Sequence, residues 1–165
     1  MNQLSPFEDQ LASLLPRLRR FAHTLSRNPA DADDLTQATI ERALRSKAQW
    51  EPGTRLDSWA YRIMRNLWID TARSRSRKSA HEAPEEGGLN VGEDPREAID
   101  AAVDLKRVMT AMERLPDEQR EVVALILVEG FGYREVSEML GLPIGTVSSR
   151  LVRGRTALLA MVGER

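Results

Sequence analysis

The stretch 79–95 divides this chain of 165 residues into two halves. It contains three Gly, two Pro and several acids, and few of its side chains could enter a core. We expect a flexible, solvated linker over 79–95, with one small domain over residues 1–78 and another over residues 96–165. A more specific alternative is that the acids of the linker imitate nucleic acid or lie in a cationic channel of a partner.

Apolar residues in the first half recur at the spacing of amphipathic helices. They predict a helix from Pro6 to Leu25 and a second helix that Asp31 caps. A loop should follow at residues 48–55, and a third helix should run from about Leu56 through Ala72.

The second half shows the same helical spacing. Pro95 can open a helix, and Leu115-Pro116 marks the next boundary. Further helices are predicted over residues 117–129, 133–140 and 144–160, with turns at 130–132 and 141–143. Neither half has an alternating strand pattern, so the predicted fold class is all-α, with two small helical domains and a helix-turn-helix in the second.

The net charge of −1 conceals a strongly uneven distribution of charge. Residues 1–78 carry 14 Lys/Arg against 9 Asp/Glu, residues 79–104 carry 1 against 8, and residues 105–165 carry 9 against 8. An acidic segment therefore separates a cationic first half from a near-balanced second half that carries an arginine-rich helix, which leaves nucleic acid open as a partner.

Several classes of protein are excluded by composition. The absence of cysteine excludes disulfides, thiolate catalysis and cysteine-based zinc sites, and it fits a reducing cytosol. His23 and His81 show no metal-ligand spacing, and we find neither a phosphate-binding glycine loop nor a nucleophile with a base. We expect no metal, no cofactor and no enzymatic activity, and without a signal peptide or a long apolar run we expect a cytoplasmic chain with no membrane insertion.

The segment 133–151 is the most specific motif. Val136 and Leu140 lie four residues apart on a short helix, and Gly141 allows the positive φ at which that helix can end. Val147 and Leu151 would pack back from a second helix, as in a helix-turn-helix that places its second helix in a major groove. The candidate DNA-binding residues on that second helix are Thr146, Ser148, Ser149, Arg150, Arg153 and Arg155. The alternative is a helical hairpin that has a solvated arginine face and no DNA-binding role.

Three segments together resemble a known family. Residues 31–44 are similar to the polymerase-docking helix of extracytoplasmic-function (ECF) sigma factors, and residues 56–75 resemble their promoter-melting helix. Residues 115–155 resemble their second domain. Ser137 stands where the family more often has alanine, and Gly154 should weaken the last helix by about 1 kcal/mol, a cost with no explanation in the sequence.

The resemblance and the residue chemistry together define two more candidate sites. Acceptors along one face of the second helix suit a basic or mixed partner surface, and the resemblance implies that they contact the clamp helices of the polymerase's largest subunit. These core-binding candidates are Asp33, Asp34, Gln37, Glu41 and Arg42. Cations on the third helix can hold phosphates of a single strand, and the loop before it could receive an unstacked base. The candidates for the minus-ten element are Trp50, Arg55, Arg62, Arg65, Asn66, Asp70 and Arg73.

The sequence therefore predicts a sigma factor that binds core RNA polymerase and recognises the minus-ten and minus-thirty-five elements of promoter DNA. The resemblance also implies an anti-sigma factor as a partner. The main alternative is a sigma-like decoy that sequesters an anti-sigma factor without binding DNA, although the arginines of both candidate sites argue against it. A response-regulator-like transcription factor would need a sensor or receiver domain, for which the chain has no room.

Overall fold

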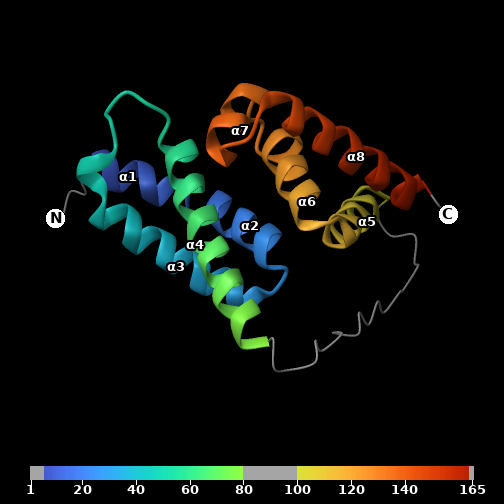
Figure 1. Cartoon of the computed structure of the whole chain (residues 1–165), viewed down its shortest axis with the longest axis horizontal. Helices are drawn as coiled ribbons and strands as arrows, with labels where there is room; N and C mark the ends of the chain where they lie inside the picture. The colour runs from blue at the N-terminus through green and yellow to red at the C-terminus, as the bar shows by residue number, and fades with distance from the viewer. Residues whose placement is uncertain (1–5, 80–99, 164–165) are drawn as a thin grey trace.

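A computed structural model describes residues 6–79 and 100–163 of the chain. All regular structure in these residues is helical (Figure 1). The first half consists of α1 (Pro6–Ser13), α2 (Leu15–Ser26), α3 (Pro29–Arg45), the 3₁₀ turn η1 (Lys47–Gln49) and α4 (Leu56–Ser79). The second half consists of α5 (Asp100–Arg114), α6 (Asp117–Val123), the π-helical turn η2 (Ala124–Val128), α7 (Tyr133–Leu140) and α8 (Ile144–Gly163).

Each half encloses a core at the places where the sequence pattern predicted apolar faces. In the first half α2, α3 and α4 pack on one another, and in the second half α8 packs on α5, α6 and α7. The most deeply buried core side chains are Leu18, Phe21, Ala60, Tyr61 and Met64 in the first half and Leu115, Val122, Leu125, Val136 and Val147 in the second. Burial of one large apolar side chain contributes roughly 1.5–3 kcal/mol, so these residues supply the main stabilisation of both halves.

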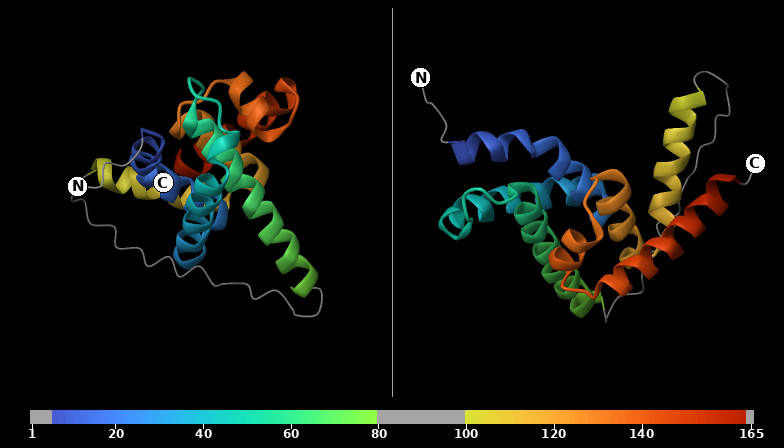
Figure 2. Two further views of the ribbon diagram at one scale, coloured as in Figure 1. Left: turned by 90° about the vertical axis from the view of Figure 1, so that its left-hand side faces the viewer. Right: turned by 90° about the horizontal axis from the view of Figure 1, so that it is seen from above.

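The two halves are in contact with each other. Helix α4 packs against α7, and α2 packs against α6. The views in Figures 1 and 2 both show the orange helices of the second half lying against the first half. The linker predicted at 79–95 lies outside the described residues except for Ser79, which is the last residue of α4.

Four local expectations were wrong. The single helix predicted from Pro6 to Leu25 is two helices, because Pro16 has no N–H to donate and a break falls at Leu14. Asn28, and not Asp31, caps α3: its side chain accepts hydrogen bonds from the backbone N–H groups of Ala30 and Asp31. Helix α4 extends past the predicted Ala72 to Ser79. The helix predicted over 117–129 changes to π geometry at Ala124.

Gly154 has a clear packing role. A Cβ atom added there would lie 2.7 Å from the Cγ2 of Val123 and 3.3 Å from the Cβ of Gln119. Val123 is buried and β-branched, so its side chain cannot rotate away without strain. Glycine at this position therefore lets α8 approach α6 closely, which offsets its low helix propensity.

We expect Gly154→Ala to destabilise the protein by about 1–2 kcal/mol, because overpacking of a tight core costs more than the roughly 1 kcal/mol of helix propensity that alanine gains. Gly145→Ala, on the same helix with no atom within 4 Å of the added Cβ, is the matched control and should be neutral or stabilising. Urea denaturation midpoints measure both effects. A Gly154→Ala protein at least as stable as the wild type would contradict this role.

No helix in the described ranges is long and apolar enough to cross a membrane.

Candidate nucleic-acid interface

Helices α7 and α8 form the helix-turn-helix that the sequence predicted. Gly141 ends α7 with φ of +66°, the left-handed conformation that glycine adopts without strain. Ser137 and Leu142 join the two sides of the turn: the Leu142 N–H donates to the Ser137 carbonyl, and the Ser137 hydroxyl donates to the Leu142 carbonyl. Ser137 therefore fastens the corner between the helices, a role that alanine could not fill.

The predicted residues of α8 differ in their accessibility. Ser149, Arg153 and Arg155 are exposed, while Thr146 and Ser148 are half-buried at the start of the helix. The side chain of Arg150 is 24% exposed, and its guanidinium lies 3.9 Å from the carboxylate of Glu118 on α6. The accessible part of the predicted DNA-binding face of α8 is therefore formed by Ser149, Arg153 and Arg155.

The predicted residues of α4 follow one side of that helix. Arg62, Asn66, Asp70 and Arg73 are exposed. Arg65 is largely buried, and its guanidinium donates to both carboxylate oxygens of Glu121, the shorter distance being 3.0 Å. Arg65, which the sequence predicted as a DNA-binding residue, is thus paired with an acid of the second half.

Trp50 packs inside the first half. Its ring lies 5.4 Å from that of Phe7 at an angle of 50°, and its buried Nε1 has no hydrogen-bond partner. A hollow of about 380 Å³ lies beside it, lined by residues of α1, η1 and the following loop, including Lys47 and Gly53. Trp59 also contacts Phe7, so α1 covers both rings. Phe7 therefore already contacts part of the ring on which a base could stack.

The predicted core-binding residues form an accessible surface on α3. Asp33, Asp34, Gln37, Glu41 and Arg42 are all exposed. The adjacent Asp31 is engaged differently: Arg75 of α4 donates two hydrogen bonds of 2.7 Å to its carboxylate, and these bonds lower the pKa of Asp31. That pair fixes the end of α4 against α3 and leaves the five predicted residues open to a partner.

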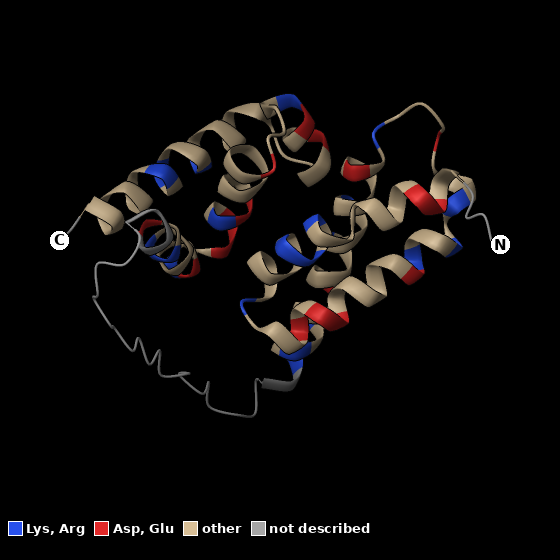
Figure 3. Cartoon of the chain, turned by 180° about the vertical axis from the view of Figure 1, so that it is seen from behind, with Lys and Arg blue, Asp and Glu red and all other residues tan. Residues whose placement is uncertain are grey.

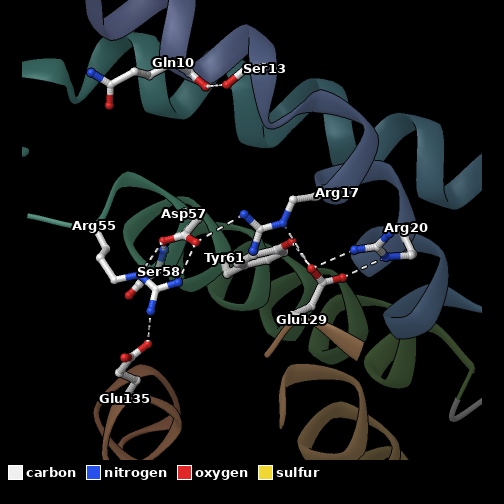
Figure 4. Close-up of polar contacts among 10 residues, drawn as sticks. All are labelled: Gln10, Ser13, Arg17, Arg20, Arg55, Asp57, Ser58, Tyr61, Glu129 and Glu135. Carbon is white, nitrogen blue, oxygen red and sulfur yellow. Dashed lines mark hydrogen bonds and ion pairs between the residues drawn. The ribbon is translucent and has the colours of Figure 1, made fainter. Parts of the chain in front are cut away.

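A cluster around Glu129 joins the two halves (Figure 4). The Glu129 carboxylate accepts two hydrogen bonds of 2.9 Å from Arg20, one of 3.2 Å from Arg17 and one of 2.9 Å from the Tyr61 hydroxyl. Only 1% of its side chain is exposed. Burial by itself would raise the pKa of Glu129, but the hydrogen bonds from Arg20, Tyr61 and Arg17 outweigh it and lower that pKa below its ordinary value.

Arg17 and Tyr61 extend this cluster into the first half. Arg17 also donates to Asp57, at 3.2 Å, so its guanidinium bridges acids from both halves. Burial and the neighbouring Glu129 charge raise the pKa of the Tyr61 phenol, which therefore remains a hydrogen-bond donor at neutral pH.

Phe131 inserts into the first half next to Glu129. It is 2% exposed, and its ring meets that of Tyr61 edge to face with 5.5 Å between centroids. The guanidinium groups of Arg55 and Arg17 lie 4.7 Å and 5.9 Å from the centre of the same ring. A buried aromatic anchor with cations at its face is a favourable arrangement for holding two modules together.

Arg120 makes a second contact across the boundary. It is 2% exposed, and it donates hydrogen bonds of 2.7 Å to the backbone carbonyls of Thr24 and Leu115 and a further bond to Asp117. Beside it lies a hollow of about 700 Å³ between α4, α6 and α8, with Arg65, Arg73 and Arg150 in its lining.

The contacts between the two halves were not predicted from the sequence. Arg55, Arg62 and Arg65 were predicted to bind DNA. No role was predicted for Arg17, Arg20, Arg120 or the glutamates of the second half. In the view of Figure 3, basic and acidic residues are distributed over both halves. In the described ranges no group of acids and histidines could hold a metal ion.

Comparisons with known proteins establish the family. Residues 11–78 match the model for sigma-70 region 2, and residues 105–158 match the model for sigma-70 region 4. The chain is 33% identical to the ECF RNA polymerase sigma factor EcfG of Rhodopseudomonas palustris over 93% of its own length and 83% of that protein.

Solved structures share the fold. The sigma factor RpoE of Bartonella quintana, solved in complex with the anti-sigma factor NepR, superposes with a TM-score of 0.83 at 29% identity and covers 98% of this chain and 100% of that one. The anti-anti-sigma factor PhyR complexed with NepR, also from Bartonella quintana, has a TM-score of 0.56 at 18% identity and covers 93% of this chain and 49% of that one. The PhyR likeness shows the fold alone. Both region models and the identity to EcfG show that this two-domain, all-helical chain belongs to the ECF-type RNA polymerase sigma factors, the non-enzymatic proteins that direct transcription initiation.

Proposed function

We propose that the chain performs this role with three separate surfaces. The α3 residues Asp33, Asp34, Gln37, Glu41 and Arg42 bind core polymerase. The α4 face and the loop before it engage the minus-ten element, and the α8 face engages the minus-thirty-five element. The observation that carries the proposal is that a helix-turn-helix with exposed Ser149, Arg153 and Arg155 shares a chain with an exposed polar face on α4.

The minus-thirty-five element is read by α8 in the major groove. Thr146, Ser148 and Ser149 lie in its first turns, where hydroxyls and backbone N–H groups can meet phosphate. Arg150 and Arg153 can reach base edges, and Arg155 extends the cationic face along the backbone.

The minus-ten element is held as a single strand along α4. Arg55, Arg62, Arg65 and Arg73 supply cations for phosphates, and Asn66 and Asp70 supply hydrogen-bonding groups for bases. Trp50 lies beside the hollow that precedes α4, and Phe7 already contacts part of its ring.

Regulation by an anti-sigma factor is supported by the complex of the similar RpoE protein with NepR. Such a partner would cover the polymerase-binding and DNA-binding surfaces. We also place the protein in the cytoplasm, where core polymerase and promoter DNA are found. The competing function is a decoy that binds an anti-sigma factor without DNA, since the PhyR fold is similar.

The decisive experiment is sequencing of the transcripts made by core polymerase reconstituted with the full chain. We expect specific initiation at a small set of genomic promoters that share two elements. Core polymerase alone is the control. If no specific transcript appears although an anti-sigma factor binds, the protein is a decoy.

Two substitutions in α8 should have different signatures. Arg150→Ala should cost about 1–3 kcal/mol of affinity for the upstream element and relax specificity at one base pair. Arg155→Ala should lower the affinity for DNA of any sequence by the same factor. It should also reduce the salt dependence of that affinity by about the amount expected for one phosphate contact. Both are measured by fluorescence anisotropy with reconstituted holoenzyme over a salt series. An unchanged affinity after Arg150→Ala would remove that residue from the site.

The α3 surface should control affinity for core polymerase. We expect Asp33→Asn combined with Asp34→Asn to weaken core binding roughly tenfold, about 1.4 kcal/mol, because two accessible carboxylates lose their complementary partners. Asp9→Asn, an equally exposed acid on α1, is the control. Equal core affinity of the double variant and the wild type, with unchanged circular dichroism, would show that this surface is only solvated.

A further inference from the structure

Three of the four arginines that the proposed function assigns to the minus-ten element are already engaged by acceptors of the second half. Arg55 donates to the Glu135 carboxylate at 2.6 Å, and Arg62 donates to the Glu138 backbone carbonyl at 2.9 Å. Arg65 is paired with Glu121. These acceptors use guanidinium N–H groups that would otherwise be available to phosphate oxygens of a DNA strand.

A second set of residues holds this arrangement without belonging to the proposed DNA site. Glu129 and Phe131 enter the first half side by side, and they contact Arg17, Arg20 and Tyr61. We call these five residues the docking contact. The π geometry of η2 shapes it, because the Glu129 N–H donates to the Ala124 carbonyl and the Phe131 N–H donates to the Leu125 carbonyl.

The docked arrangement is incompatible with simultaneous binding of both promoter elements. Their names place them roughly 25 base pairs apart, which is about 85 Å of duplex at 3.4 Å per step. In the structure the α4 face and α7, the first helix of the helix-turn-helix, touch through the hydrogen bond from Arg62 to Glu138. The two DNA-binding modules must separate before the protein can span a promoter.

We propose that the second half is an intramolecular competitor of promoter DNA. The docking contact closes the chain, and in the closed state Glu121 and Glu135 pair with Arg65 and Arg55 while the Glu138 carbonyl accepts a hydrogen bond from Arg62. Binding of a single strand to α4 and closure of the chain are then mutually exclusive. This inference rests on the function proposed above for the α4 arginines.

Competition of this kind has a quantitative consequence. When only the open state binds, the apparent affinity is reduced by the fraction of molecules that are open. A substitution that opens the chain without touching the DNA site should therefore raise DNA affinity, and the gain cannot exceed the reciprocal of the fraction of wild-type molecules that are open.

Glu129→Gln is the informative variant. It keeps the size of the side chain but removes the charge that Arg17 and Arg20 share. Asp104→Asn, an exposed acid of α5 in the same half, is the control with the same change in net charge. Arg20→Ala provides a second opening variant that should leave folding intact, because that side chain is 45% exposed.

The experiment uses the full chain, whose lack of native cysteine permits site-specific labelling. Fluorophores are attached at Ser13→Cys and Ala160→Cys, which are exposed positions in opposite halves. Energy transfer reports the distance between the halves, and fluorescence anisotropy of a random-sequence single-stranded oligonucleotide of about 12 nucleotides reports DNA affinity.

We expect Glu129→Gln to raise the ratio of open to closed molecules about tenfold and the oligonucleotide affinity by up to the same factor. Arg20→Ala should act in the same direction, and Asp104→Asn should leave both readouts unchanged. Unchanged energy transfer in both opening variants would overturn the proposal. If the chain opens but its affinity for the oligonucleotide does not rise, the second half does not compete with DNA for α4.

Failure of the proposed function gives a different result. Adding Arg62→Ala to the opened Glu129→Gln chain should abolish most of the gain in affinity if α4 binds the strand. If the gain persists unchanged, the assignment of DNA binding to the α4 arginine is wrong, while the change in energy transfer still stands as evidence for docking.

Discussion

The burial of one carboxylate, that of Glu129, determines how the two halves of this sigma factor are related. Two arginines and a phenol from α2 and α4 donate to a side chain that is 1% exposed. Removing one partner of a fully buried pair costs about 3–5 kcal/mol, and an exposed pair contributes about 0–1 kcal/mol. The cluster lies between these limits, because its acid is buried while Arg17 and Arg20 are 32% and 45% exposed.

The same guanidinium groups can serve two kinds of anion. Arg55, Arg62 and Arg65 face carboxylate and carbonyl oxygens inside the closed chain, and they would face phosphates on an open promoter. Such exchange keeps the cations satisfied in both states and avoids a large free cationic surface.

Local structure could be predicted from the sequence wherever a residue strongly prefers one backbone conformation. Gly141 ends α7 with positive φ, Pro116 precedes α6, and the apolar spacing located α7. The pairing of Arg65 with Glu121 could not be predicted, because residues 56 positions apart meet only when two separately folded helices pack. Gly154 had no explanation in the sequence for the same reason: the atoms that exclude a Cβ belong to α6.

The short π-helical turn η2 sets the rotational alignment of the two halves. A regular α-helix advances 100° per residue, so loss of one residue from Ala124–Val128 would turn the exit of α6 by about that angle. Glu129 would then point away from α2 and α4, and the buried side chains of Ala124 and Leu125 would change their register in the core of the second half. The length of this turn thus couples the packing of α6 to the recognition between the halves, and an insertion or deletion there would change both together.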